Sequence, residues 1–409
     1  MKALLLLLTV SVVFAARRFD GEQVLRIHPE HEGHLEKLVR LERSERSLDF
    51  WKGPTSLSRP VDVRVPKDLL KKVKTMLENT GMKYTVMVND LQQSISMERS
   101  RHTRSAGFNF DDYNTYDEIV DQLEDFAESY PNLTSVFSIG ASSEKLYIYG
   151  IKVGAAGSNK PAVFLEGQLH ARDWIVSATL MYNIKFLLEG YGSDNQTTTL
   201  MDQVDFYFIP VTNVDGYVYT YEIDRMWKKT RSYHKGSWCF GVDANRNWDE
   251  VDAVWQHFDS SSSDPCSDDY LGPYSFSEPE TEAVSDWVLT NSNDVKAYLS
   301  VQAYGEKWMT PYGWTTGAQQ LPPDQEQFHL ANRAAGASFS VGTIAELSGM
   351  AAGSSCDWAY TVAGIKYSYA IELRDMWDGY VLPADQIRPS ADEFFAGLLV
   401  VAEQVAVEY

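Results

Sequence analysis

The sequence predicts an α/β protein in two parts. Helices should cover both faces of a mixed, largely parallel sheet in a large domain, an α/β/α sandwich, and a small α+β domain of ferredoxin-like type should precede it. One supporting observation is the length of 409 residues, which favours two domains. A second is the alternation of strand-like and helix-like segments along the chain. A third is charge: residues 17–104 carry 18 basic and 13 acidic residues, a net charge of +5, whereas residues 105–409 carry 17 and 44, a net charge of −27. Opposite net charges predict that the two parts attract each other, and the acidic part is unsuited to nucleic acid.

The first 16 residues have the pattern of a secretory signal peptide. Lys2 gives a positive start, Leu4 to Phe14 form an apolar run, and Ala15 and Ala16 are small residues suited to a cleavage site. The run is shorter than the roughly 20 apolar residues that span a membrane. We therefore expect a secreted protein with no membrane partner.

Residues 17–104 should form the small domain and its connector. The strand- and helix-like segments follow the order βαββαβ, which is the ferredoxin-like arrangement. The expected strands are Val24–Ile27, Leu48–Trp51, Val61–Val65 and Tyr84–Val88, and the expected helices are His34–Leu41 and Leu69–Leu77. This part contains no cluster of titratable residues that suggests catalysis.

The connector, residues 92–104, is polar and rich in Ser and Arg. Arg99, Arg101 and Arg104 are expected to be exposed at the domain boundary, where proteolytic cuts concentrate. A trypsin-like cut at Arg101 or Arg104 would release residues 105–409. The alternative is a solvated linker helix without processing.

The large domain, residues 105–409, shows strands alternating with helices. The expected strands are Val136–Ser142, Leu146–Val153, Ala162–Leu165, Asp205–Val211, Tyr298–Gln302 and Tyr367–Leu373, and the expected helices are Tyr116–Tyr130, Ile175–Leu188 and Ala391–Ala406. The first two strands should form a hairpin. About 300 residues suffice for a large core.

The stretch Pro161–Trp174 is the strongest candidate for a functional site. A buried strand ends at Gly167, and His170 and Asp173 follow at the turn into a helix. Ligands bind at the carboxyl ends of strands in open α/β sheets, and imidazole and carboxylate groups are both zinc ligands. The alternative is a polar turn that caps the helix.

Three motifs carry a resemblance that covers nearly the whole chain: GQLHARDWI, GVDANRNW and YSYAIELRD. The chain resembles the zymogens of the secreted pancreatic-type (A/B) zinc metallocarboxypeptidases, of insect or arthropod digestive type. The resemblance implies one zinc ion, removal of C-terminal residues from peptides, a prodomain that acts as its own inhibitor, possible protein inhibitors as partners, a gut-lumen location and a monomeric state.

The resemblance also implies residue roles. Glu372 would be the general base, while its alternative is a surface ion pair with Arg374. Asn245 and Arg246 would bind the terminal carboxylate of the substrate, although Arg246 could instead form a structural ion pair. Further substrate contacts are implied for Arg172, Tyr304 and Tyr380.

Four expected catalytic positions depart from the family pattern. The zinc ligands would be His170, Asp173 in place of Glu, and Gln302 in place of His, and an amide oxygen suits calcium or magnesium better than zinc. Lys228 replaces an Arg that stabilises the oxyanion, and Gly349 falls where a mobile substrate-binding Tyr is expected. Cys356 occupies the specificity position and gives the pocket no acid, so an apolar preference is expected.

The remaining motifs concern disulfides and glycans. Cys239, Cys266 and Cys356 allow one bridge, and the resemblance favours Cys239 with Cys266. Asn132 and Asn195 begin glycosylation sequons, and each could equally be an unused surface turn.

Two functional hypotheses follow. The first is a secreted zinc carboxypeptidase that acts through Glu372. The second is a catalytically inactive homologue that binds peptide C-termini, or carboxypeptidase inhibitors, through Asn245 and Arg246. No G-x-S-x-G motif suggests a serine hydrolase.

Overall fold

The computed structural model describes residues 16–99, 107–157, 159–249, 261–315, 325–336, 338–374 and 377–409. The predicted signal peptide, except for its last residue, and the predicted processing residues Arg101 and Arg104 lie outside these ranges.

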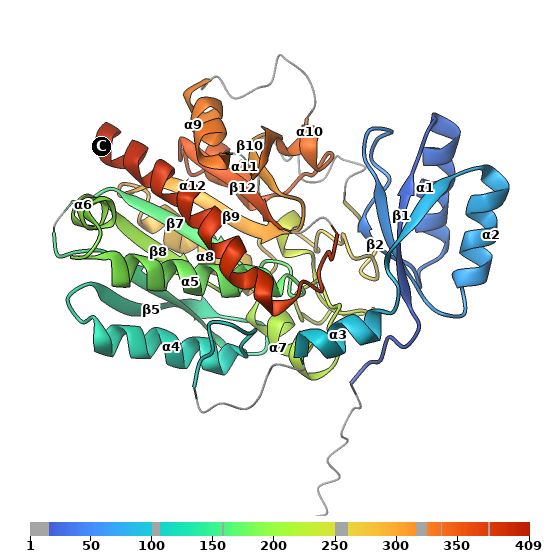
Figure 1. Ribbon diagram of the computed structural model, residues 1–409, viewed down its shortest axis with the longest axis horizontal. Helices are drawn as coiled ribbons and strands as arrows, with labels where there is room; N and C mark the ends of the chain where they lie inside the picture. Colours follow the sequence, from blue (N-terminus) through green and yellow to red (C-terminus); the bar gives the residue numbers. More distant parts are fainter. Residues whose placement is uncertain are drawn as a thin grey trace, which may run out of the picture.

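The small N-terminal domain has the predicted βαββαβ order. Its elements are β1 (Gln23–His28), α1 (Glu32–Ser44), β2 (Asp49–Lys52), β3 (Val61–Val65), α2 (Leu70–Thr80) and β4 (Lys83–Val88). The four strands form an antiparallel sheet in the order β2-β3-β1-β4. Apolar residues of β1, β3 and both helices make a separate core, which includes Leu25, Leu38, Val63 and Leu77. Figure 1 shows this domain, in blue, packed against one end of the large domain.

A helix, α3 (Leu91–Arg99), follows the small domain and packs against the large one. Glu98 is buried and binds the Arg225 guanidinium with both carboxylate oxygens, at 2.7 and 2.8 Å. Arg99 donates to the backbone oxygens of Thr220 and Tyr221. The prediction that Arg99 is exposed is therefore wrong: it is half-buried, because this side of α3 docks on the large domain.

The large domain is built on an eight-stranded mixed sheet in the order β11-β10-β12-β9-β7-β8-β6-β5. The four central strands β12, β9, β7 and β8 are parallel, and antiparallel pairs adjoin them on both sides. The strands are β5 (Thr134–Ala141), β6 (Tyr147–Val153), β7 (Ala162–Gly167), β8 (Asp205–Ile209), β9 (Val295–Ala303), β10 (Lys307–Thr310), β11 (Ser340–Thr343) and β12 (Tyr367–Leu373). This confirms the predicted fold class, including the hairpin of β5 and β6.

Helices cover both faces of this sheet. They are α4 (Tyr116–Ser129), α5 (Trp174–Gly190), α6 (Asn195–Gln203), α7 (Val214–Glu222), α8 (Pro279–Thr290), α9 (Gln325–Ala335), α10 (Ile344–Leu347), α11 (Ser355–Thr361) and α12 (Ile387–Glu408), with short 3-10 turns η1 (Ala244–Arg246) and η3 (Ala384–Gln386). On one face, Trp287 of α8 stacks on Phe164 of β7 with ring centroids 5.1 Å apart. On the other, α5 and α12 lie side by side and are joined by a hydrogen bond from Thr179 to Ser390.

Three further observations complete the fold. Cys239 and Cys266 form the expected disulfide, and Cys356 remains a buried thiol. Both sequon asparagines, Asn132 and Asn195, are exposed. Within the described ranges, no helix has the length and apolarity that crossing a membrane requires.

Candidate functional site

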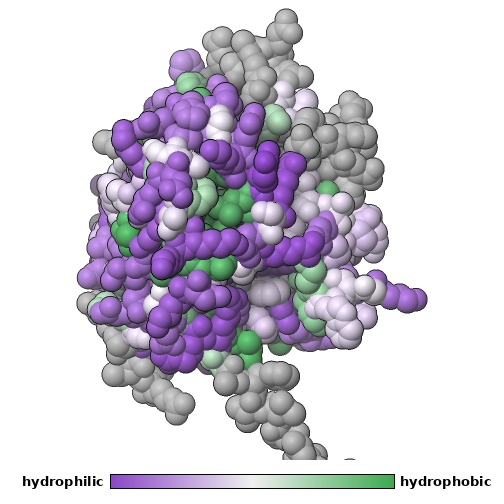
Figure 2. Space-filling view, turned by 90° about the vertical axis from the view of Figure 1, so that its right-hand side faces the viewer, coloured by the Kyte–Doolittle hydropathy of each residue, from purple (hydrophilic) through white to green (hydrophobic). Residues whose placement is uncertain are grey.

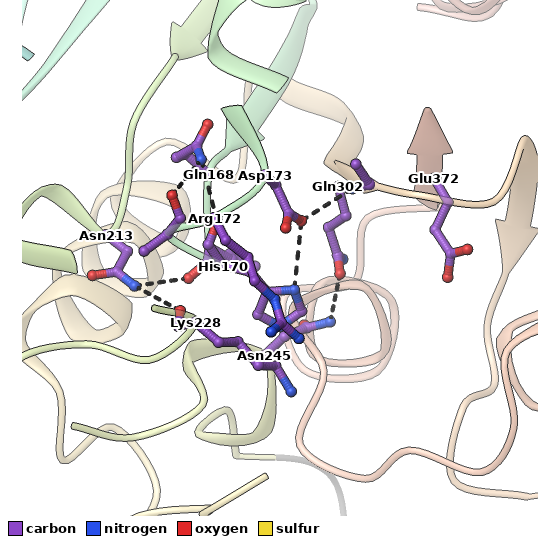
Figure 3. A network of polar contacts seen from close by, with 12 residues as sticks. Gln168, His170, Arg172, Asp173, Asn213, Lys228, Asn245, Gln302 and Glu372 are labelled. Carbon is purple, nitrogen blue, oxygen red and sulfur yellow. Dashed lines mark hydrogen bonds and ion pairs between the residues drawn. The ribbon is translucent and has the colours of Figure 1, made fainter. Parts of the chain in front are cut away.

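The candidate site lies where the central parallel strands end. His170 and Asp173 follow β7, Gln302 is near the end of β9, and Glu372 is near the end of β12. Parallel strands end at one edge of a sheet, so segments about 70 residues apart or more meet there. Figure 3 shows His170, Asp173, Asn245 and Gln302 converging, with Glu372 to one side.

His170 lies between two carboxylates. Its Nε2 is 3.0 Å from Asp243 Oδ1, and its Nδ1 is 3.6 Å from Asp173 Oδ2. Burial lowers the pKa of His170, but the charge of Asp243 and the contacts with both carboxylates outweigh it, and the pKa is raised. The imidazole is thus held by carboxylates on both of its nitrogens.

Asp173 occupies the N-cap position of α5, but its side chain does not cap the helix. Oδ2 instead accepts a hydrogen bond from the backbone N–H of Ala303, at 3.1 Å. The interpretation of this turn as a simple helix cap is therefore wrong. Oδ1 is buried and has no hydrogen-bond partner within the described part of the chain.

The Gln302 carboxamide is part of a hydrogen-bond network. Its Oε1 accepts from Asn245 Nδ2 at 3.2 Å, and its Nε2 donates to Ser300 Oγ at 3.2 Å. Asn245 is fixed at its other end, because Oδ1 accepts from the backbone N–H of Ser355. The position expected to hold a metal is therefore occupied by an amide that binds protein atoms.

Glu372 is bound by a lysine that sequence analysis missed. Lys307 is its direct neighbour across β10 and β12, and its Nζ lies 2.7 Å from Glu372 Oε2. The Ser348 hydroxyl donates to Glu372 Oε1, at 2.7 Å, and accepts from Lys307 Nζ. Burial raises the pKa of Glu372, but Lys307 and the neighbouring Lys52 lower it more, and the pKa falls below its usual value. The expected alternative, an ion pair with Arg374, is wrong because Arg374 binds Glu393.

Lys228 is also held by carboxylates. Its Nζ lies 2.9 Å from Asp243 Oδ2 and 2.7 Å from Asp269 Oδ1. Burial lowers the pKa of Lys228, but these two acids raise it well above its usual range. Asp243 thus joins His170 to Lys228. It lies two residues before Asn245 in the GVDANRNW motif, and this position is the feature of the sequence from which its place in the site could have been predicted.

The small domain covers the site. Asp49 binds the Arg172 guanidinium at 3.0 Å, and Arg172 lies over the Tyr380 ring, 4.2 Å from its centroid. Asp62 accepts a hydrogen bond from the Tyr304 hydroxyl at 2.7 Å. The face that this domain turns outward is mostly hydrophilic, with hydrophobic residues in small separate areas (Figure 2). Three predicted substrate-binding residues therefore contact the small domain or lie beneath it.

A cavity of about 920 Å³ remains between the two domains, lined by Asn245, Arg246, Gln302, Cys356 and Glu372 among others. One part of its lining is an apolar cluster of Met309, Ile344, Ala351, Cys356 and Ala370. Arg246 Nη1 donates to the backbone oxygen of Asn245 at 2.8 Å. An apolar pocket thus lies in the same cavity as a guanidinium and an amide.

Gly349 also lines this cavity. Its φ of +98° is a conformation that favours glycine, and an added Cβ would lie 2.8 Å from Thr55 Cγ2 in the small domain. The backbone here does not suit the tyrosine that the resemblance places at this position.

Comparison with known proteins agrees with the fold and with the resemblance seen in the sequence. Residues 25–98 match the carboxypeptidase activation peptide family, and residues 119–397 match the zinc carboxypeptidase family. Carboxypeptidase A2 of Rattus norvegicus is 38% identical over 98% of each chain. The structure of carboxypeptidase A from Helicoverpa armigera has a TM-score of 0.82 and 27% identity, over 95% of this chain and 98% of that one. Bovine thrombin-activatable fibrinolysis inhibitor, solved with tick carboxypeptidase inhibitor, has a TM-score of 0.67 and 34% identity, over 73% and 99%.

The chain belongs to the zinc carboxypeptidase family and has the organisation of a procarboxypeptidase, with an activation-peptide domain that covers the site. We refer to the two parts below as the prodomain and the catalytic-type domain.

The residues at the site do not fit the zinc ion that the family implies. Catalytic zinc takes three protein ligands and keeps one position open. Of the three expected ligands, only His170 and Asp173 are of the types His, Cys, Asp or Glu. The described residues contain no group of three or more such side chains placed to hold a metal. A neutral amide with two protein partners takes the third place.

Proposed function

We propose that the catalytic-type domain binds the C-terminal carboxylate of peptides and carries out no zinc-dependent hydrolysis. The observation that carries this proposal is Gln302, whose carboxamide binds Asn245 and Ser300 in place of a metal ligand. Loss of a ligand from the first coordination shell should cost more than the 10–100-fold in affinity that outer-shell losses cost.

The binding half of the proposal is supported by the residues that remain. Asn245 and Arg246 provide an amide N–H and a guanidinium, the donors that suit a carboxylate. The apolar cluster around Cys356 and Met309 lies in the same cavity and contains no acid. We therefore propose a ligand with a free C-terminus and an apolar last side chain.

Three further residues argue against hydrolysis. Glu372 is bound to Lys307, so the negative charge of the carboxylate that would act as base is already paired with an ammonium group. Lys228 is held by Asp243 and Asp269, so it is not free to move and donate to an oxyanion. Gly349 supplies no phenol. Catalytic groups act as a unit, so several changes together are expected to abolish turnover.

The test uses the chain before and after trypsin, which we propose cuts near Arg101 or Arg104. Zinc is counted by elemental analysis after dialysis against zinc, beside the variant Asp173→Glu/Gln302→His. Calorimetry then compares N-acetyl-Gly-Phe with its C-terminal amide. We expect almost no zinc in the natural chain, about one zinc per molecule in the variant, and binding of the free acid but not of the amide.

About one zinc in the natural chain, together with release of phenylalanine, would instead make it a working carboxypeptidase. Equal binding of acid and amide would show that the terminal carboxylate is not what the site recognises.

A second candidate ligand is a protein carboxypeptidase inhibitor, for which the site would act as a decoy. It is supported by the structural neighbour solved with tick carboxypeptidase inhibitor. Secretion, with the gut lumen as the location, is supported by the signal-peptide pattern and by the disulfide, a bond typical of exported proteins.

A further inference from the structure

We infer that Gln302 is a positioning residue that orients the Asn245 carboxamide toward a ligand carboxylate. The inference rests on the proposed function and adds to it: the residue that replaces a metal ligand would support binding instead.

Four residues form a closed ring of hydrogen bonds. The Ser355 N–H donates to Asn245 Oδ1 at 3.1 Å, and Asn245 Nδ2 donates to Gln302 Oε1 at 3.2 Å. Gln302 Nε2 donates to Ser300 Oγ at 3.2 Å, and Ser355 Oγ donates to Ser300 Oγ at 3.0 Å. The ring ties β9 to η1 and to the first turn of α11.

The ring fixes which end of each amide is oxygen and which is nitrogen. A backbone N–H can only donate, so the Asn245 atom facing Ser355 must be Oδ1 and the opposite atom must be Nδ2. Since Nδ2 donates to Gln302, the Gln302 atom that faces it must be Oε1. Gln302 and Asn245 are each only 9% exposed and both serines are fully buried, so water offers these groups little alternative.

The arrangement leaves Asn245 with a donor for a ligand. Nδ2 carries two N–H groups, and Gln302 accepts one of them. The other is available to a carboxylate in the cavity, where Arg246 follows Asn245 along the chain. Without Gln302 the carboxamide would keep one restraint, at Ser355, and would turn more freely.

The test measures binding of N-acetyl-Gly-Phe to the full chain by calorimetry, with the C-terminal amide as reference. Gln302→Met keeps a similar length and removes both hydrogen bonds. We expect it to weaken free-acid binding about tenfold, the effect of losing roughly one hydrogen bond. In an Asn245→Ala background the same substitution should have almost no further effect, because a residue acting through Asn245 has nothing left to orient.

A matched control is Gln327→Met on α9. Gln327 is also buried and donates to a backbone oxygen, that of Ser368, but it lies outside the site and its replacement should leave binding unchanged. If Gln302→Met fails to fold, Ser300→Ala removes the anchor of Gln302 and is expected to weaken free-acid binding about threefold.

Normal free-acid binding by Gln302→Met, or an equal loss with and without Asn245, would overturn the inference. Failure of the natural chain to prefer the acid over the amide would overturn the proposed function instead, so the two failures are distinguishable.

Discussion

At the scale of single residues, the contact between Glu372 and Lys307 decides what the carboxylate can do. A general base works best when its pKa lies near the operating pH. Lys307 holds the pKa of Glu372 below its usual value, so this carboxylate is ionised but has a weak affinity for protons. Because of this charge partner on the neighbouring strand, Glu372 does not have the pKa that a general base requires.

Replacing Lys307 with methionine should lower the free energy of unfolding by about 3 kcal/mol, because it leaves a largely buried carboxylate unpaired. Urea denaturation measures the change. The double variant Lys307→Met/Glu372→Met is the control, and it should recover most of the loss, since an apolar pair often replaces a buried ion pair at little cost. A double variant no more stable than Lys307→Met would contradict this account.

The stabilisation provided by Glu372 should depend on pH. Its folded-state pKa is lowered, so the contribution is present above the unfolded pKa, about 4.3, and is lost as pH falls through the folded value. The natural chain should therefore be more stable than Glu372→Gln at neutral pH, and the difference should shrink on acidification below about 4. A difference that stays constant from pH 7 to pH 3 would show that the carboxylate charge is not responsible.

At the scale of elements, the disulfide closes a loop that contains three residues of the site. Cys239 and Cys266 are 27 residues apart, and Asp243, Asn245 and Arg246 lie between them. The bridge restricts the unfolded chain and also limits how far η1 can move from the end of β9.

The variant Cys239→Ser/Cys266→Ser should lose about 3.5 kcal/mol of stability, from the loop-closure entropy of a loop of this length. Guanidinium denaturation gives the stability, and calorimetry with N-acetyl-Gly-Phe gives the binding. We expect weaker free-acid binding as well, because the ring through Asn245 depends on the position of η1. The natural chain in buffer with a reducing agent is the control, since it should behave like the variant. Unchanged stability would show that the loop is held by its other contacts.

At the scale of the whole molecule, buried ion pairs join the prodomain to the catalytic-type domain. Asp49 binds Arg172 from the other domain and Arg64 from its own, and Glu98 binds Arg225. Burial raises the pKa of Asp49, but the two guanidinium groups lower it more, so Asp49 stays charged. Cutting the connector alone would leave these contacts in place.

We expect the prodomain to remain bound after trypsin and Asp49→Asn to weaken its binding about 100-fold, because two buried guanidinium groups lose a charge partner. Size-exclusion chromatography of the trypsin-treated chain at low micromolar concentration measures this. Asp20→Asn is the control, since Asp20 forms an exposed pair with Arg18 and should have no effect. Equal retention of the prodomain in both variants would show that apolar contacts suffice.

The sequence by itself determined the βαββαβ order of the small domain, the fold class of the large one and the place of the site. The strands β10 and β11 and the helices α6 to α11 were not predicted. Periodic apolar residues and turn residues act over a few positions, so segments such as Ala162–Leu165 and Tyr367–Leu373 could be recognised locally. The position of His170 and Asp173 after a buried strand was equally visible. Only the tertiary structure decided what these residues bind. Gln302 meets Asn245 from 57 residues away, and Arg172 meets Asp49 from 123 residues away. Lys307 meets Glu372 through the register of β10 and β12. Such contacts depend on how distant segments pack, which no local pattern of residues encodes.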